Sequence, residues 1–93
     1  MAASIKAVKV YIKVSVVFDE DGQMLPRAFE WEDGRKYKID RVLKKRPAHA
    51  DKVGGQGDRY TVLIGGRERY LFFEPSYNGD NLGRWFVEKE VLT

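Results

Sequence analysis

The amino-acid sequence predicts an all-β protein that folds as one small antiparallel barrel. Short runs alternate apolar and polar residues, as half-buried strands do. Turns that contain glycine separate these runs at short intervals. No stretch shows the apolar period of a helix of three turns. With 93 residues the chain has the length of one domain, which we take as residues 1–93.

The first predicted strand covers residues 8–18 and alternates most strictly. Its core-facing residues are Val8, Val10, Ile12, Val14, Val16 and Phe18. Residues 19–22, Asp-Glu-Asp-Gly, predict a turn, because Asp and Gly tolerate the backbone angles that turns require. A second strand follows over residues 25–32, and Pro26 near its start indicates a strand beginning or a sheet edge.

Asp33-Gly34 is the clearest hairpin signal in the chain. It leads into a third strand that carries Tyr37 and Ile39 inward and continues to Leu43, with a bulge expected where Val42 and Leu43 break the alternation. A long loop is expected over about residues 46–57. Further strands are predicted at residues 60–64, 70–74 and 84–91, which gives five or six strands in all.

Short strands joined mainly by tight turns indicate a closed or nearly closed antiparallel barrel. An open sheet of this size would leave apolar edge strands unpaired and prone to aggregate. The SH3-like barrel is favoured, because its strands are short and its successive hairpins meander. The OB-fold barrel is the alternative; it often has a helix between its third and fourth strands, where this chain has a linker with several glycines and a proline.

The composition excludes several classes of protein. The absence of cysteine excludes disulfides and thiolate metal sites and fits a reducing cytoplasm. The first ten residues lack the apolar run of a signal peptide. Lys9, Lys13 and Ser15 interrupt the most apolar stretch, so no membrane span is expected. We therefore expect a cytoplasmic protein, and its net charge of +3 favours anionic partners only weakly.

Positive charge is concentrated between Arg41 and Arg59, where six basic residues accompany two acidic ones. Such charge beside flexible glycine backbone suits phosphate oxygens, which accept hydrogen bonds from Lys, Arg and backbone N–H groups. The alternative is a long loop whose charges face solvent and bind nothing. The candidate phosphate-binding residues are Lys44, Lys45, Arg46, Lys52 and Arg59.

Aromatic residues form a second candidate feature. Tyr70 and Phe72 occupy the face of their strand opposite Leu71, and one core cannot receive both faces. Either the N-terminal segment or the closing strand covers the second face, or it is an exposed shelf on which nucleic-acid bases stack. Tyr70 and Tyr77 are the candidate stacking residues, whereas Trp31 and Trp85 are expected as core anchors.

Three other segments do not meet the requirements of the sites that they suggest. Residues 54–59, Gly-Gly-Gln-Gly-Asp-Arg, lack the Gly-Lys-Ser/Thr ending of a nucleotide-binding loop and precede a strand. His49 has only Asp51 as a near partner for acid–base or metal chemistry. Residues 19–30 place Met24 where a calcium loop needs glycine. We therefore expect no metal, no cofactor, no small-molecule substrate and no enzymatic activity.

Three segments carry a resemblance: residues 29–43, 57–74 and 83–91. Their shared features are Phe-x-Trp, a glycine turn, Tyr-x-Ile, an Arg-Tyr strand and a closing Arg-Trp. In these features the chain resembles a group of small uncharacterised bacterial proteins and is similar to an accessory module of some proteins related to DNA-repair polymerases. The resemblance implies a bacterial β-barrel and a nucleic-acid context, and it supplies no catalytic residue.

Two functions remain. The first is nucleic-acid binding of low sequence specificity through the basic segment. The alternative is an SH3-type module that binds an extended peptide or a partner protein beside exposed aromatics and the acidic cluster of Glu30, Glu32 and Asp33. If the basic residues converge on an aromatic face, nucleic acid is favoured. If acids surround the aromatics, the peptide module is favoured.

Overall fold

The computed structural model describes residues 4–49, 56–76, 79 and 81–93. Within these ranges the chain forms strands and no helix. The strands are β1 (Ile5–Phe18), β2 (Met24–Glu30), β3 (Lys36–Lys38), β4 (Arg41–His49), β5 (Gln56–Ile64), β6 (Arg67–Pro75) and β7 (Gly83–Leu92). They form one antiparallel sheet in the order β3-β2-β1-β7-β6-β5-β4, so the all-β prediction is confirmed.

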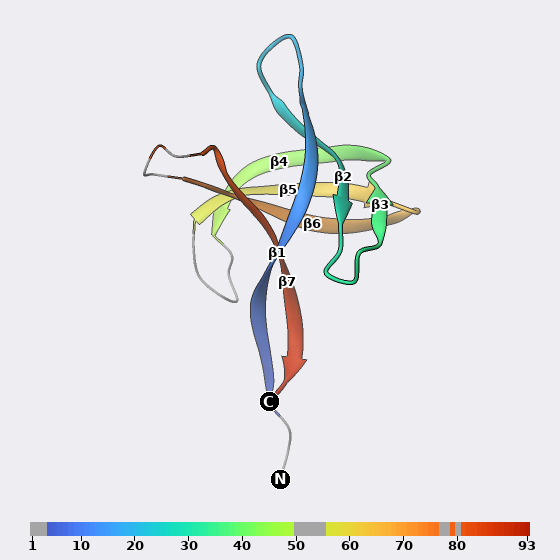
Figure 1. The fold of residues 1–93 in the computed structure, drawn as a ribbon, viewed down its shortest axis with the longest axis vertical. Helices are drawn as coiled ribbons and strands as arrows, with labels where there is room; N and C mark the ends of the chain where they lie inside the picture. The colour runs from blue at the N-terminus through green and yellow to red at the C-terminus, as the bar shows by residue number, and fades with distance from the viewer. Residues whose placement is uncertain (1–3, 50–55, 77–78, 80) are drawn as a thin grey trace.

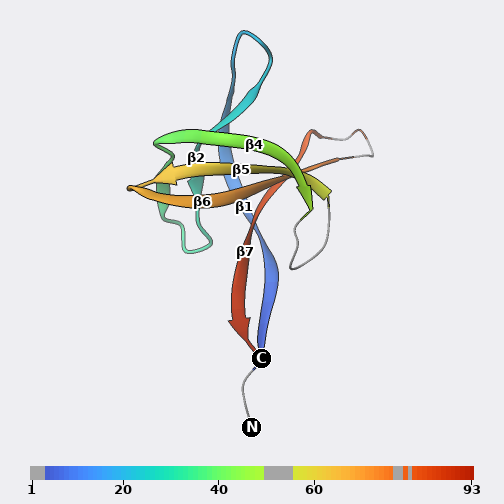
Figure 2. The ribbon, with the colours of Figure 1, turned by 180° about the vertical axis from the view of Figure 1, so that it is seen from behind.

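The sheet curls into a half-barrel. In Figure 1, β4, β5 and β6 run across the view, while β1 and β7 run along the long axis of the molecule. Figure 2 shows the same crossing from behind. The two edge strands, β3 and β4, follow each other in the chain, so the short connection between them bridges the two edges of the sheet.

That connection consists of Ile39 and Asp40. The N–H of Ile39 donates to the Arg27 carbonyl of β2 at 2.9 Å, and the N–H of Asp40 donates to the Leu63 carbonyl of β5 at 2.8 Å. The predicted third strand is therefore two strands that meet at a corner, and the described residues hold seven strands rather than five or six. The predicted bulge is confirmed, since the pairing of β4 with β5 shifts between Val42 and Lys44.

The long loop predicted over residues 46–57 is wrong at both ends. β4 continues to His49 and β5 begins at Gln56, and the ladder pairs Arg46 with Arg59 and Pro47 with Asp58. Proline is tolerated here because β4 is an edge strand whose outer N–H groups have no ladder partner. Residues 50–55 lie outside the described residues.

The core lies on the concave side of the sheet. Its buried members are Ile39, Tyr60, Val62, Leu71 and Trp85. Burial desolvates the Tyr60 hydroxyl, which donates to the Met24 carbonyl at 3.0 Å and so joins β5 to β2 across the barrel. The expected core anchor Trp85 is confirmed.

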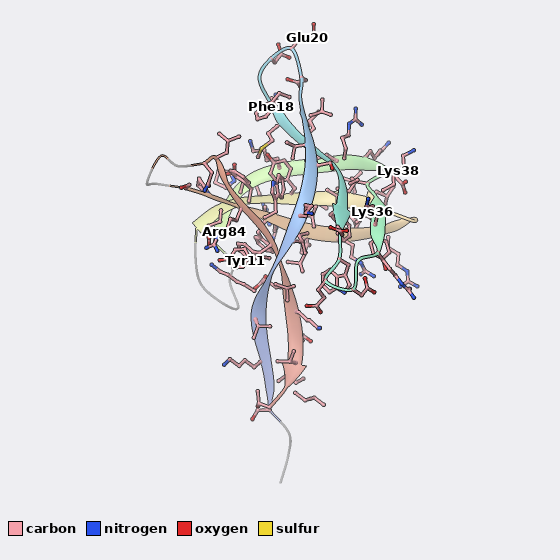
Figure 3. All side chains as sticks on the ribbon, viewed as in Figure 1. Tyr11, Phe18, Glu20, Lys36, Lys38 and Arg84 are labelled. Carbon is pink, nitrogen blue, oxygen red and sulfur yellow. The ribbon has the colours of Figure 1, made fainter. Side chains whose placement is uncertain are left out.

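Five expected core residues lie outside the core cluster, and three of them, Val8, Val10 and Tyr37, are half-buried. Phe18 is 54% exposed, because the end of β1 and the start of β2 project beyond the rest of the sheet as a hairpin, with Phe18 near its tip (Figure 3). Trp31 follows β2 and is only half-buried. The alternation of β1 holds for the core-facing residues Ile12, Val14 and Val16, which pack against the core.

The pairing of β6 with β7 is short. It runs only from Phe72 opposite Phe86 to Pro75 opposite Gly83. Beyond Phe86, β7 stays with β1 as a two-stranded ribbon that leaves the body of the half-barrel (Figure 1). β6 and β7 therefore diverge and leave an opening in the sheet. In the described part of the chain, no helix has the length and apolar character needed to cross a membrane.

Candidate functional site

A row of side chains crosses the outer face of the sheet, the face opposite the core residues Tyr60 and Leu71. Directly paired residues on neighbouring antiparallel strands point to the same face. The row contains one residue from each of five adjacent strands, β4, β5, β6, β7 and β1: Arg46, Arg59, Phe72, Phe86 and Tyr11. Two arginines therefore stand at one end of a line of aromatic rings.

The rings of Phe72 and Phe86 are stacked, with centroids 5.1 Å apart, and Tyr11 meets Phe86 edge-on at 5.8 Å. Phe72 and Phe86 are 5% and 2% exposed, so the closing strand does cover the outer face of β6 at this point. Tyr70, two residues before Phe72, is 52% exposed. The prediction that the closing strand covers the second face therefore holds for Phe72, whereas Tyr70 is open to solvent and its role as a stacking residue stays a prediction.

Glu74 neutralises the basic residues at the β1 end of this face. Its carboxylate accepts from Lys9 at 2.7 Å, from Arg84 at 3.1 Å and from the Tyr11 hydroxyl at 3.2 Å. The hydrogen bond from Lys9 holds the pKa of Glu74 below its ordinary value, and the same bond raises the pKa of Lys9. The Arg84 guanidinium also stacks on Tyr11 at 3.9 Å (Figure 3). These charges are satisfied within the protein.

The β4 and β5 end of the outer face is different. Lys44 is paired with Thr61 and Arg46 with Arg59, so three basic residues share this face. No carboxylate among the described residues forms an ion pair with any of the three. The Arg59 guanidinium lies over the Tyr70 ring at 4.4 Å. Like charges directly opposite each other destabilise a sheet, so this pair of arginines carries a cost that no described acid offsets.

The structure does not bring all the predicted residues together. Lys45 points to the inner side, where its ammonium lies 3.6 Å from Asp58 and 5.4 Å from the centre of the Tyr60 ring. Burial lowers the pKa of Lys45, but Tyr60 and Asp58 outweigh that effect and the pKa is raised. Lys52 and Tyr77 lie outside the described residues.

Three buried side-chain atoms in the described part of the chain have no hydrogen-bond partner: Arg59 Nε, Thr61 Oγ1 and Glu88 Oε2. All three belong to the surroundings of Tyr70. Arg59 stacks on its ring, Thr61 is its partner on β5, and Glu88 lines the same groove. A buried polar group without a partner costs about 1–3 kcal/mol. Sequence reasoning missed Thr61 and Glu88, since neither carries a motif.

The opening between β6 and β7 is a groove of about 600 Å³. It joins the β2–β3 hairpin to β6 and β7. Seven of its lining side chains are aromatic or charged: Phe29, Trp31, Tyr37, Arg69, Tyr70, Phe72 and Glu88. Local sequence patterns do not predict the groove, because it exists only where two strands cease to pair.

The acidic cluster expected beside a peptide-binding surface is neutralised. Each of its carboxylates has a basic partner: Glu30 with Lys13 at 3.5 Å, Glu32 with Lys89 at 2.9 Å and Asp33 with Arg35 at 3.6 Å. These acids therefore do not stand free to attract a basic peptide.

The described residues include no group of three or more His, Asp or Glu side chains placed to hold a metal ion. The side chain of His49 lies outside the description. We compared the chain with models of protein families, with curated proteins and with solved structures, and none of the three comparisons gave a match. The resemblance drawn from the sequence therefore stays a prediction.

Proposed function

We propose that this protein binds single-stranded nucleic acid on the outer face of β4, β5 and β6, without catalysis. One observation carries the proposal. Arg46 and Arg59 stand opposite each other with no described carboxylate partner, directly beside the half-exposed ring of Tyr70. Phosphates offset the repulsion between the arginines, and the tyrosine offers a ring on which a base stacks, worth about 1–3 kcal/mol.

This part of the surface has little sequence specificity, because contacts to phosphate carry no sequence information. Lys44 extends the same basic surface by one more side chain along β4. The contrast with the Glu74 end of the face supports the assignment. There Lys9 and Arg84 are paired with a carboxylate of the protein. The basic residues on β4 and β5 have no described carboxylate partner and can bind a ligand.

Further proposals concern the fold family, the location and the alternative function. An SH3-like barrel remains our proposal for the fold family, supported by the meander of successive hairpins from β4 to β7. A cytoplasmic location remains a proposal supported by the absence of cysteine from the sequence. An SH3-type peptide module has less support, since its acidic cluster is already paired within the chain.

The test is fluorescence anisotropy with labelled oligo-dT and oligo-rU of about ten nucleotides, a length within the range of small single-strand sites. Titrations are done at about 50 mM and about 200 mM salt. Arg46→Gln should weaken binding of both oligonucleotides and reduce the slope of log K against log salt by about 0.7, the value for one lost phosphate contact on a single strand. Tyr70→Ala should weaken binding about tenfold through lost stacking.

The matched control is Lys36→Gln. Lys36 is an exposed cation on β3 (Figure 3), the edge strand opposite β4 in the sheet order, and its loss changes the net charge by the same amount. The control should bind like the wild type. If Lys36→Gln weakens binding as much as Arg46→Gln, attraction to overall charge explains the binding and the proposed site is wrong.

A further inference from the structure

The groove between β6 and β7 is continuous with the proposed binding face. Tyr70 and Phe72 line the groove and also stand on the outer face beside Arg59. Its volume of about 600 Å³ lies within the range of roughly 300–1,000 Å³ typical of small-ligand sites. A strand lying across Arg46 and Arg59 therefore passes the mouth of a site large enough to admit one of its bases.

The walls of the groove suit a flat aromatic ligand. Phe29 and Tyr37 are stacked with centroids 5.2 Å apart, and Trp31 and Tyr70 add two further rings from the turn after β2 and from β6. Aromatic side chains that line a groove are the usual means by which proteins hold an unstacked base.

Two opposite charges line the same groove without pairing. No ion pair joins Glu88 to Arg69 among the contacts of the described residues. Lys9, which faces Glu88 across the β1–β7 ladder, gives its ammonium to Glu74 instead. One oxygen of the Glu88 carboxylate is consequently buried with no donor. The groove thus contains an acceptor and a donor that the protein itself leaves unmatched.

We infer that this groove takes a guanine base of the bound strand. Guanine donates from N1–H and its 2-amino group on one edge, which suits the carboxylate of Glu88. On its other edge it accepts at O6 and N7, which suits the guanidinium of Arg69. Thymine and adenine do not present paired donors on one edge and paired acceptors on the other. The inference rests on the proposed function and adds a base preference to it.

The experiment compares oligo-dT with the same strand carrying one central guanine, adenine or hypoxanthine. The wild type should bind the guanine strand about tenfold tighter than oligo-dT, as one well-placed bidentate contact allows. The hypoxanthine strand should lose most of that gain, since it lacks the 2-amino group. Because it uses the wild-type protein, this comparison does not depend on a variant that folds.

Glu88→Gln should abolish the preference for guanine and leave the affinity for oligo-dT unchanged. Glu20→Gln is the control: Glu20 is exposed at the tip of the β1–β2 hairpin, away from Lys36 and Lys38 (Figure 3), which flank the groove residue Tyr37, and its substitution removes the same charge. It should keep the preference. In a parallel titration, guanosine monophosphate should shift the amide resonances of Arg69 and Glu88.

The outcomes separate the two proposals. If oligo-dT binds but guanine brings no gain, or if Glu88→Gln keeps the gain, the guanine site is refuted and the proposed function stands. If no oligonucleotide binds at either salt concentration, both are refuted. If an extended peptide shifts the resonances of Arg69 and Glu88 while guanosine monophosphate does not, the groove is a peptide site and the inference is wrong.

Discussion

Some basic side chains on the outer face are paired with a carboxylate and others are not, and the position of a single residue, Glu74, decides which. Lys9 and Arg84 converge on the carboxylate of Glu74, whereas Arg46 and Arg59 face each other. In the sequence nothing shows which of these four residues will find a carboxylate partner. Only the pairing of β6 with β7 and of β7 with β1 brings Glu74 within reach of the first two.

The Glu74 cluster gives a pH-dependent contribution to stability. The pKa of Glu74 is lowered in the folded protein from its ordinary value of 4.5. The stabilisation is therefore present above pH 4.5 and is lost as the pH falls through the folded pKa. The raised pKa of Lys9 acts in the opposite direction, since its stabilisation is lost only above the ordinary lysine value of 10.5.

We expect Glu74→Gln to lower the free energy of unfolding at pH 7 by about 1 kcal/mol, a modest value because the carboxylate is partly exposed and screened by solvent. The difference between the wild type and the variant should shrink as the pH falls below 4.5 and through the lowered pKa of Glu74. Urea denaturation at pH 7 and at a series of lower pH values measures this. Glu20→Gln, at an exposed turn, should leave the free energy of unfolding unchanged at each pH, and a Glu74 difference that does not decrease with falling pH would contradict the ionic origin.

At the scale of elements, β4 and β5 extend into a segment that reads as a loop. Pro47 and Gly57 suggest irregular backbone, yet they are paired in the ladder with Asp58 and Ala48. Proline costs nothing on the edge strand β4. Glycine at 57 is required by the close approach of β5 to β6, since a Cβ there would overlap the Phe73 carbonyl oxygen. Composition alone cannot distinguish such residues from loop residues.

Gly57→Ala tests this extension. If residue 57 belongs to β5, the added methyl group collides with the backbone of β6, and we expect a loss of about 1–3 kcal/mol in the free energy of unfolding. Gly66→Ala is the comparison: its methyl group enters open space, and the variant bears only the strain of a positive φ. Thermal or urea denaturation should therefore show the larger loss for Gly57→Ala. An unaffected Gly57→Ala would mean that the segment is a loop.

At the scale of the whole molecule, the corner at Ile39 and Asp40 joins the two edges of the curled sheet. Ile39 is 2% exposed, and the backbone at this corner bonds to both β2 and β5. The Asp40 carboxylate also accepts from the Gly65 N–H at 2.9 Å, which ties the corner to the turn between β5 and β6. The two edges of a seven-stranded sheet are thus held together by two consecutive residues.

Ile39→Ala should lower the free energy of unfolding by about 2–5 kcal/mol, because it empties a buried site at the point where the edges meet. Ile5→Ala removes the same atoms from a side chain that is 68% exposed, and we expect a change within about 0.5 kcal/mol. Urea denaturation of both variants gives the comparison. Equal losses would show that the corner does not hold the sheet together.

The sequence by itself determined the all-β class, most strand positions, the bulge at Val42 and the hairpin turns, because these depend on residues close together in the chain. It also placed Trp85 inward and Tyr70 on the face opposite the core. The tertiary structure alone decided the corner at Ile39, the partners of Glu74, the buried Glu88 oxygen without a donor and the groove beside it. Each of these depends on which distant strands pair and where they stop pairing, and local alternation carries no information about that.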